Sequence, residues 1–174
     1  MNNKLITKLL ESALFVALIA IGGLISFPIP ISEVPFSLQT LFVLLASLVL
    51  GPIFGTITCI VYLLLGVIGL PIFASMKAGP FVLIGPTGGY LIGFVVQAPI
   101  VGILSRKIHP IIALASGLLT IYLIGVIQLS AISKISLTAG IIAGILPFLP
   151  FDILKLIIAY AVYAKLPKEL KEDS

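Results

Sequence analysis

The chain has 174 residues, of which 60% are hydrophobic and 9% are charged. A soluble domain carries about 25% charged residues, so this composition excludes a soluble globular protein and indicates an integral membrane protein. The net charge of +4 is spread along the chain, without the basic cluster that a nucleic-acid-binding surface needs. A spanning helix needs about 20 residues, so we predict an all-α, polytopic membrane protein with six transmembrane helices in one membrane domain, residues 1–174.

The first predicted helix covers Ile6–Ser26. Lys4 and Lys8 precede its apolar run, as in a secretory signal, but no Ala-x-Ala-like cleavage site follows and further apolar segments do. We therefore interpret the run as a retained helix. Ala13 and Ala17 stand four residues apart on it. Small residues at this spacing either let a partner helix approach closely or serve packing within the protein.

A proline-rich loop, Phe27–Pro35, separates this helix from the next. Its three prolines forbid a helix and favour extended backbone, and its apolar side chains suggest that it packs over the protein like a lid. The following helix is predicted over Phe36–Leu50, about 22 Å long and so shorter than a hydrocarbon core of about 30 Å. We expect its polar residues, Gln39 and Thr40, to face a partner or a cavity.

A Gly51-Pro52 turn leads to a helix predicted over Ile53–Leu70, and a second long connection, Pro71–Pro86, follows it. The next helix is predicted over Gly85–Leu104. The glycine-rich turn that opens it lacks the Lys-Ser/Thr pair of a phosphate-binding loop. We expect instead a close backbone approach at three glycines and a helix N-terminus able to face an anionic group. These glycines are Gly88, Gly89 and Gly93.

The last third of the chain is predicted to contain a helix over Ile111–Leu129, a half-helix over Thr138–Leu146 and a helix over Leu149–Lys165. The middle segment is too short to cross a membrane and is interpreted as re-entrant. The chain has one cysteine, Cys59, and one histidine, His109. Neither has a partner residue of its kind, so we expect no disulfide, no metal site and no cofactor.

Asp152 and Lys155 lie inside an apolar run that extends from about Ile135 to Leu166. A charged residue near the centre of a membrane helix costs about 2.5 to 3.5 kcal/mol, so two charges in one segment predict a polar interior. At a spacing of three residues, both project to the same side of a helix. They therefore either bind a ligand or form an ion pair that locks the helix bundle.

The basic residues predict the topology. With six spans, seven basic residues fall on one side of the membrane and two on the other, and the positive-inside rule makes the first side cytoplasmic. They are Lys4, Lys8, Arg106, Lys107, Lys165, Lys168 and Lys171, against Lys77 and Lys134 on the other side. We expect a multi-pass protein of the cell membrane with both termini cytoplasmic and a pocket that faces outward.

Four sequence blocks, in this order, carry a resemblance to a known family. They are Val34-Pro35-Phe36-Ser37-Leu38-Gln39-Thr40, Leu65-Gly66-Val67-Ile68-Gly69-Leu70-Pro71-Ile72-Phe73-Ala74, Gly85-Pro86-Thr87-Gly88-Gly89-Tyr90-Leu91-Ile92-Gly93-Phe94 and Leu149-Pro150-Phe151-Asp152-Ile153-Leu154-Lys155. The chain resembles the BioY family, the biotin-binding S-components of energy-coupling-factor (ECF) vitamin transporters. It departs from many relatives at Ile53 and Phe54, where basic residues are common, and at Phe151, often glycine.

The resemblance implies six helices and an outward pocket that the first loop closes. It also implies ATP-driven uptake of biotin, powered by a transmembrane coupling subunit and two ATPase subunits. An Ala-x-x-x-Ala face of the first helix would dock on the coupling subunit, and Ala13 and Ala17 match it.

Biotin has two ureido N–H donors, a ureido carbonyl, an apolar fused ring and a carboxylate. Asp152 could accept from the N–H groups, and Lys155 could donate to the ureido oxygen or to the carboxylate. Lys77 and the amides near Gly88 are rival partners for the carboxylate. The remaining candidates are Ser75, Gln39 and Tyr90 for hydrogen bonds, and Phe36 and Phe73 for packing on the ring.

Three alternatives stay open at this point. The chain could be an S-component for another small vitamin, or a membrane subunit in which the charged pair is purely structural. An intramembrane enzyme using Asp152 and Lys155 as acid and base is disfavoured, since no nucleophile or third polar group is placed to assist them. We expect a transport subunit that is not an enzyme.

Overall fold

The computed structural model describes residues 3–167. It is built mainly from helices: α1 (Asn3–Leu24), α2 (Gln39–Val67), α3 (Gly88–Leu104), α4 (Pro110–Ile132), α5 (Leu137–Gly144) and α6 (Leu149–Lys165). It also contains two short 3₁₀ turns, η1 (Ala74–Met76) and η2 (Pro80–Val82), and two strands of two residues each, β1 (Ser26–Phe27) and β2 (Phe36–Ser37). Lys168 and Lys171, which the topology prediction also used, lie outside the described residues.

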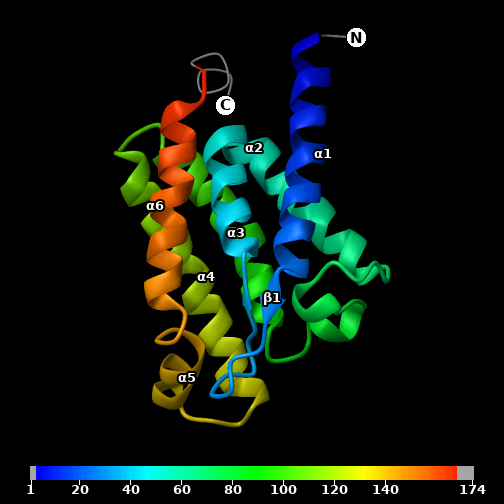
Figure 1. Cartoon of the computed structure of the whole chain (residues 1–174), viewed down its shortest axis with the longest axis vertical. Coiled ribbons are helices and arrows are strands. Elements are labelled where there is room, and N and C mark those ends of the chain that lie inside the picture. The colour runs from blue at the N-terminus through cyan, green and yellow to red at the C-terminus, as the bar shows by residue number, and fades with distance from the viewer. Residues whose placement is uncertain (1–2, 168–174) are drawn as a thin grey trace.

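The six predicted spans correspond to α1, the two halves of α2, α3, α4 and α6. Gly51 divides α2, because its φ of 74° and ψ of −173° are not helical, and the halves run in different directions in Figure 1. Of the described helices, α1, α2 and α4 are long and apolar enough to cross a membrane. The bent pair of α5 and α6, at 55°, would form a fourth such span.

The elements place two groups of connections at opposite ends of the bundle. The start of α1 and the end of α6 lie at the top of Figure 1, whereas β1, β2 and α5 lie toward the bottom. The end with α1's start is also where α3 passes into α4, near Arg106 and Lys107. Arg106 and Lys107 therefore lie at the same end as the start of α1, which carries Lys4 and Lys8.

Glycines allow α3 to pack closely on α4. A Cβ atom at Gly93 would lie 2.9 Å from Cα of Ile121, and one at Gly89 would lie 3.0 Å from Cα of Gly125. At Gly88, a Cβ atom would collide with the carbonyl of Leu83. The predicted close backbone approach at these three glycines is confirmed, and it brings the cavity-facing side chains of α3 and α4 together.

The outer face of α4 is apolar. Leu119, Leu123 and Ile127 recur every four residues and are 56 to 61% exposed, while Ile121 and Tyr122 on the inner face are buried. Such a ridge is stable only against an apolar solvent, because burial of apolar area is worth about 25 cal/mol per Å² in water. This face is therefore the one that contacts lipid.

Two predicted helix boundaries were wrong around the first loop. The first helix ends at Leu24 and not at Ser26, and the second begins at Gln39 and not at Phe36. The intervening residues form an antiparallel ribbon in which Ser26 pairs with Ser37. The prolines of the loop prevent a helix here, so the backbone cannot form helical hydrogen bonds. The hydrogen bonds between β1 and β2 satisfy backbone groups of this segment instead. The ribbon carries the loop across the lower end of the bundle.

Candidate ligand-binding site

A cavity opens at the end of the bundle that carries the ribbon. Its walls come from β2, the start of α2, the connection before α3, and the inner faces of α3, α4 and α6. The space inside it that a water-sized sphere can reach is about 60 Å³, less than the about 300 to 1,000 Å³ that is usual for small-molecule sites. The polar residues that line it are Ser37, Gln39, Thr40, Lys77, Thr87, Tyr90, Tyr122, Asp152 and Lys155.

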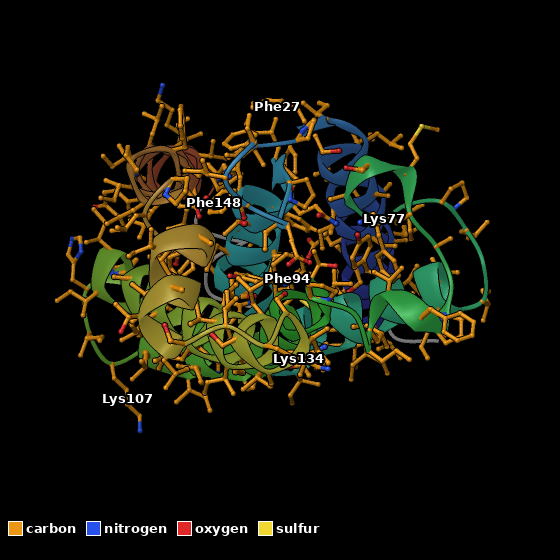
Figure 2. All side chains as sticks on the ribbon, turned by 90° about the horizontal axis from the view of Figure 1, so that it is seen from below. Phe27, Lys77, Phe94, Lys107, Lys134 and Phe148 are labelled. Atoms are coloured by element: carbon orange, nitrogen blue, oxygen red, sulfur yellow. The ribbon has the colours of Figure 1, made fainter. Side chains whose placement is uncertain are left out.

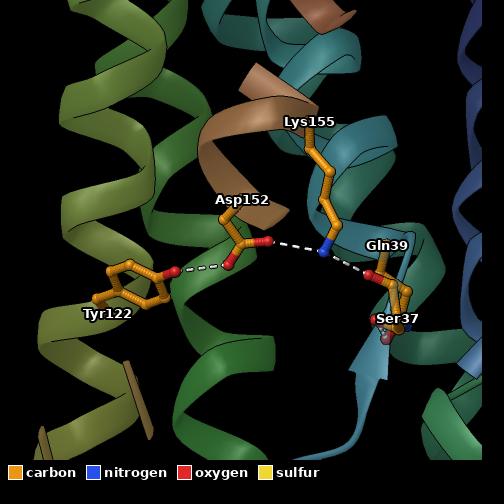
Figure 3. Close-up of polar contacts among 5 residues, drawn as sticks. All are labelled: Ser37, Gln39, Tyr122, Asp152 and Lys155. Atoms are coloured by element: carbon orange, nitrogen blue, oxygen red, sulfur yellow. Dashed lines mark hydrogen bonds and ion pairs between the residues drawn. The ribbon is translucent and has the colours of Figure 1, made fainter. Parts of the chain in front are cut away.

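The buried charged pair lies in the first turns of α6. Asp152 and Lys155 are each 4% exposed, and Nζ of Lys155 donates to Oδ1 of Asp152 at 2.6 Å. The other carboxylate oxygen accepts from the hydroxyl of Tyr122 on α4, also at 2.6 Å (Figure 3). The predicted projection of both charges to one side of the helix is confirmed, and both line the cavity.

Lys155 is held by protein groups on three sides. Besides Asp152, its ammonium donates to the backbone carbonyl of Ser37 at 2.7 Å and lies 4.1 Å from the centroid of the Phe36 ring. An ammonium has three donors and a carboxylate has about four lone pairs. The contacts thus occupy Lys155 almost fully, while Asp152 accepts two hydrogen bonds and keeps acceptor capacity for a further donor in the cavity.

Gln39 and Tyr90 also line the cavity, but their polar groups bind the protein itself. The amide nitrogen of Gln39 donates to the hydroxyl of Tyr62, and its amide oxygen accepts from Oγ of Ser37 at 3.1 Å. The hydroxyl of Tyr90 donates to the carbonyl of Gly144 at 3.0 Å. These bonds fix the orientation of both side chains along the wall.

The turn around η1 brings Phe73 and Lys77 to the cavity. The amide of Phe73 donates to the carbonyl of Lys77 at 3.1 Å, and Ser75 and Met76 between them have positive φ angles of 61° and 57°. Phe73 is 1% exposed, whereas Lys77 is exposed. Among the cations that line the cavity, Lys77 is thus the one whose ammonium is accessible.

Two predicted site residues do not line the cavity. Ser75 is exposed, and its amide donates to Oγ of Ser26 at 2.7 Å, because the left-handed backbone turns it toward β1. Phe36 lies behind Lys155 and stacks on Phe27, with ring centroids 4.5 Å apart. Seen from this end, Phe27 lies at the edge of the molecule and Phe94 nearer its middle (Figure 2).

Tyr122, Phe94 and Phe148 line the cavity but were not among the predicted site residues. A sequence signal existed for Tyr122, because it is a hydroxyl-bearing residue in a long apolar helix. It stands three residues before Gly125, on the same face of that helix. Nothing in the sequence distinguishes the two phenylalanines from other apolar residues of their helices. Their rings give the cavity apolar walls beside the charged pair.

Ala13 and Ala17 lie far from the cavity, on the outer face of α1. Both are exposed, while Ser12, Phe15 and Ile19 on the other face are buried. The two alanines therefore do not pack within the described part of the chain. They leave a shallow strip on the surface where another helix could approach the backbone.

Comparisons with known proteins agree on one family. The model of the BioY family matches residues 1–172. The chain is 41% identical over 165 residues to the biotin transporter BioY of Thermotoga maritima, covering 92% of this chain and 96% of that protein. It is 41% identical over 154 residues to a probable biotin transporter BioY of Pyrococcus horikoshii, covering 88% and 92% respectively.

A solved structure shows the same fold. The crystal structure of the S-component for biotin from an ECF-type ABC transporter matches with a TM-score of 0.87 at 31% sequence identity, and the match covers 98% of each chain. The family match in sequence and the match in structure therefore both extend over nearly the whole chain. The chain belongs to the BioY family.

Proposed function

We propose that this protein is the biotin-binding S-component of an ECF-type transporter. Its relatives are named biotin transporters and its structural match is an S-component for biotin, so the chain acts in transport and is not an enzyme. The observation that carries the proposal is the buried Asp152 carboxylate, which lines the cavity and keeps free acceptor capacity beside Lys155 and Tyr122. A ureido ring with two N–H donors is a ligand that such a group suits.

The apolar part of the site suits the fused ring. Phe73, Phe94 and Phe148 line the cavity with Leu91 and Ile121, and contact with them removes apolar ligand surface from water. In this arrangement the ureido head lies at Asp152, deep in the cavity. The valeryl chain then extends toward the accessible end.

The carboxylate of biotin is assigned to Lys77. Lys155 is already engaged by Asp152 and the Ser37 carbonyl, and the amide of Gly88 donates to the carbonyl of Gly85 at 3.1 Å. Lys77 lines the cavity with an exposed side chain. A charge-assisted hydrogen bond to a carboxylate there would not require a protein contact to break.

The proposal also includes the partner subunits of the transporter and the orientation of the chain in the membrane. The exposed strip at Ala13 and Ala17 would dock on a transmembrane coupling subunit, and two ATPase subunits would power uptake. Both termini would lie in the cytoplasm and the cavity would open outward at the cell membrane, because Lys4, Lys8, Arg106 and Lys107 gather at the end opposite the cavity.

Mass spectrometry of protein purified from biotin-fed cells tests the ligand directly. We expect one unmodified biotin per chain. Another vitamin in its place would identify an S-component of different specificity, and a chemically altered product would support the enzyme alternative.

The assignment of Lys77 has its own test. Lys77→Met should weaken binding of biotin but leave binding of biotin amide, which lacks the carboxylate, almost unchanged. Ser75→Ala is the matched control, since Ser75 lies in the same turn but does not line the cavity. Equal loss for biotin and its amide would show that Lys77 does not contact the carboxylate.

A further inference from the structure

The connection between α2 and α3, Ile68–Thr87, exposes large apolar side chains. Ile68, Met76, Phe81 and Ile84 are 65 to 79% exposed, and Phe81 has the highest value of them. Lys77 is the only charged residue of this segment. A segment of this composition is unfavourable in water, where each such side chain would gain about 1.5 to 3 kcal/mol from burial.

The outward direction of Phe81 and Ile84 is fixed by contacts on the inner side. Nε2 of Gln128 on α4 donates to the carbonyl of Leu83 at 2.6 Å and to that of Gly85 at 2.8 Å, on either side of Ile84. Val82, next to Phe81, lines the cavity. These contacts fix the backbone of the connection against the bundle. The side chains of Phe81 and Ile84 therefore point away from the bundle.

The connection lies at the depth where α1 ends. The amide of Ser75 donates to Oγ of Ser26, two residues beyond α1, and the carbonyl of Ile72 packs directly against Gly23. In Figure 1, the connection begins level with the lower end of α1 and continues below it, though less far than α4 and α5. The apolar span Lys4–Leu24 has 21 residues, a rise of about 31 Å, which matches a hydrocarbon core of about 30 Å.

The helices on either side of the connection are too short for such a core. Pro52–Val67, the second half of α2, rises about 24 Å, and α3, with 17 residues, rises about 25 Å. Each leaves about 5 Å of hydrocarbon to be filled. The exposed apolar surface of the connection continues that of the two helices, which expose Leu64 and Ile92.

We propose that the connection Ile68–Thr87 is embedded in the membrane, with Ile68, Met76, Phe81 and Ile84 among the acyl chains at the hydrocarbon boundary. It completes the apolar length that α2 and α3 lack. The wall of the cavity at Val82 is then backed by lipid and not by water. This inference does not depend on the identity of the ligand.

The absence of tryptophan from the sequence allows a direct test. Three variants each carry a single Trp: Phe81→Trp in the connection, Leu119→Trp on the lipid-facing ridge of α4, and Glu33→Trp in the exposed first loop. The full chain is placed in phosphatidylcholine vesicles, with and without bromine-labelled acyl chains. Quenching by the labelled lipid and by aqueous iodide is then compared, and melting temperatures confirm that each variant is folded.

We expect Phe81→Trp to lose fluorescence in brominated lipid about as strongly as Leu119→Trp, and to resist iodide. Its emission should lie at shorter wavelength than that of Glu33→Trp. Strong iodide quenching of Phe81→Trp, equal to that of Glu33→Trp, would overturn the proposal in favour of a water-exposed loop. Protection from both quenchers would also overturn it, because a second protein copy would then cover the residue.

Discussion

The charged pair in α6 offers the sharpest test of the site, through Asp152→Asn, Lys155→Met and the double variant. Asp152 accepts two hydrogen bonds at 2.6 Å, and both charged residues are 4% exposed. If a ureido N–H adds a further hydrogen bond to the carboxylate, its loss costs roughly 1.5 to 3 kcal/mol. We therefore expect Asp152→Asn to weaken biotin binding by about 10- to 150-fold.

Each single change also leaves one buried charge without its partner. In Asp152→Asn, the Lys155 ammonium would face a neutral amide beside the Ser37 carbonyl and the Phe36 ring, and breaking a buried pair costs about 3 to 5 kcal/mol of stability. A destabilised protein binds less ligand for a trivial reason, so single variants alone cannot separate the two roles. The double variant removes both charges and leaves no unpaired ion, so it should recover much of the thermal stability.

Calorimetric titration with biotin and a thermal melt in the same detergent give the two required numbers. We expect the double variant to fold with near-native stability and to bind biotin at least about 10-fold more weakly, from the same hydrogen-bond energy. If it keeps both near-native stability and near-native affinity, the pair is not part of the ligand site. If stability alone falls, the pair is an ion lock for the bundle.

Three further predictions concern the rest of the chain. Cysteine at Ser32 should react with an impermeant maleimide in intact cells, and cysteine at Lys107 should not; reaction of Lys107→Cys from outside would invert the topology. Replacing Ala13 and Ala17 by Trp should abolish uptake and complex assembly while biotin binding by the isolated subunit survives, since both are exposed; lost binding would indicate internal packing. Replacing the loop Phe27–Pro35 by a Gly/Ser linker of equal length should speed biotin release, because the prolines limit the conformations lost on closure; an unchanged off-rate would mean that the loop is not a lid.

Local patterns were sufficient for the features that depend on one helix at a time. Hydropathy located the helices, and a spacing of three residues placed Asp152 and Lys155 together, because neighbours on a helix are set by its geometry alone. The close approach at Gly89 and Gly93 was also predictable, since only a missing Cβ permits it. None of these inferences needed to know which helices are adjacent.

The contacts of the pair with the rest of the molecule could not be predicted in this way. Tyr122 is 30 residues from Asp152, and the partner of Lys155 on β2 is a backbone carbonyl, which every residue possesses. The ribbon that presents this carbonyl is two residues long on each strand, too short for a sequence pattern. Ser75 was misplaced because its left-handed backbone reverses the direction that an extended connection would give it.

Tyr122 separates positioning of Asp152 from its charge. Tyr122→Phe removes one hydroxyl and leaves the ion pair with Lys155 intact. Thr58→Val is a matched control, because Thr58 is also buried and its hydroxyl donates to the Phe54 carbonyl at 2.8 Å, away from the cavity lining.

Both variants should lose about 1 to 3 kcal/mol of stability from a broken buried hydrogen bond. Only Tyr122→Phe should also weaken biotin binding, since the freed carboxylate can rotate away from the cavity. Equal affinity losses in the two variants would show that the effect comes from general loosening of the bundle. A loss confined to Tyr122→Phe means that α4 holds Asp152 in place for the ligand, so the site depends on the packing of α4 against α6 as well as on the charges of α6.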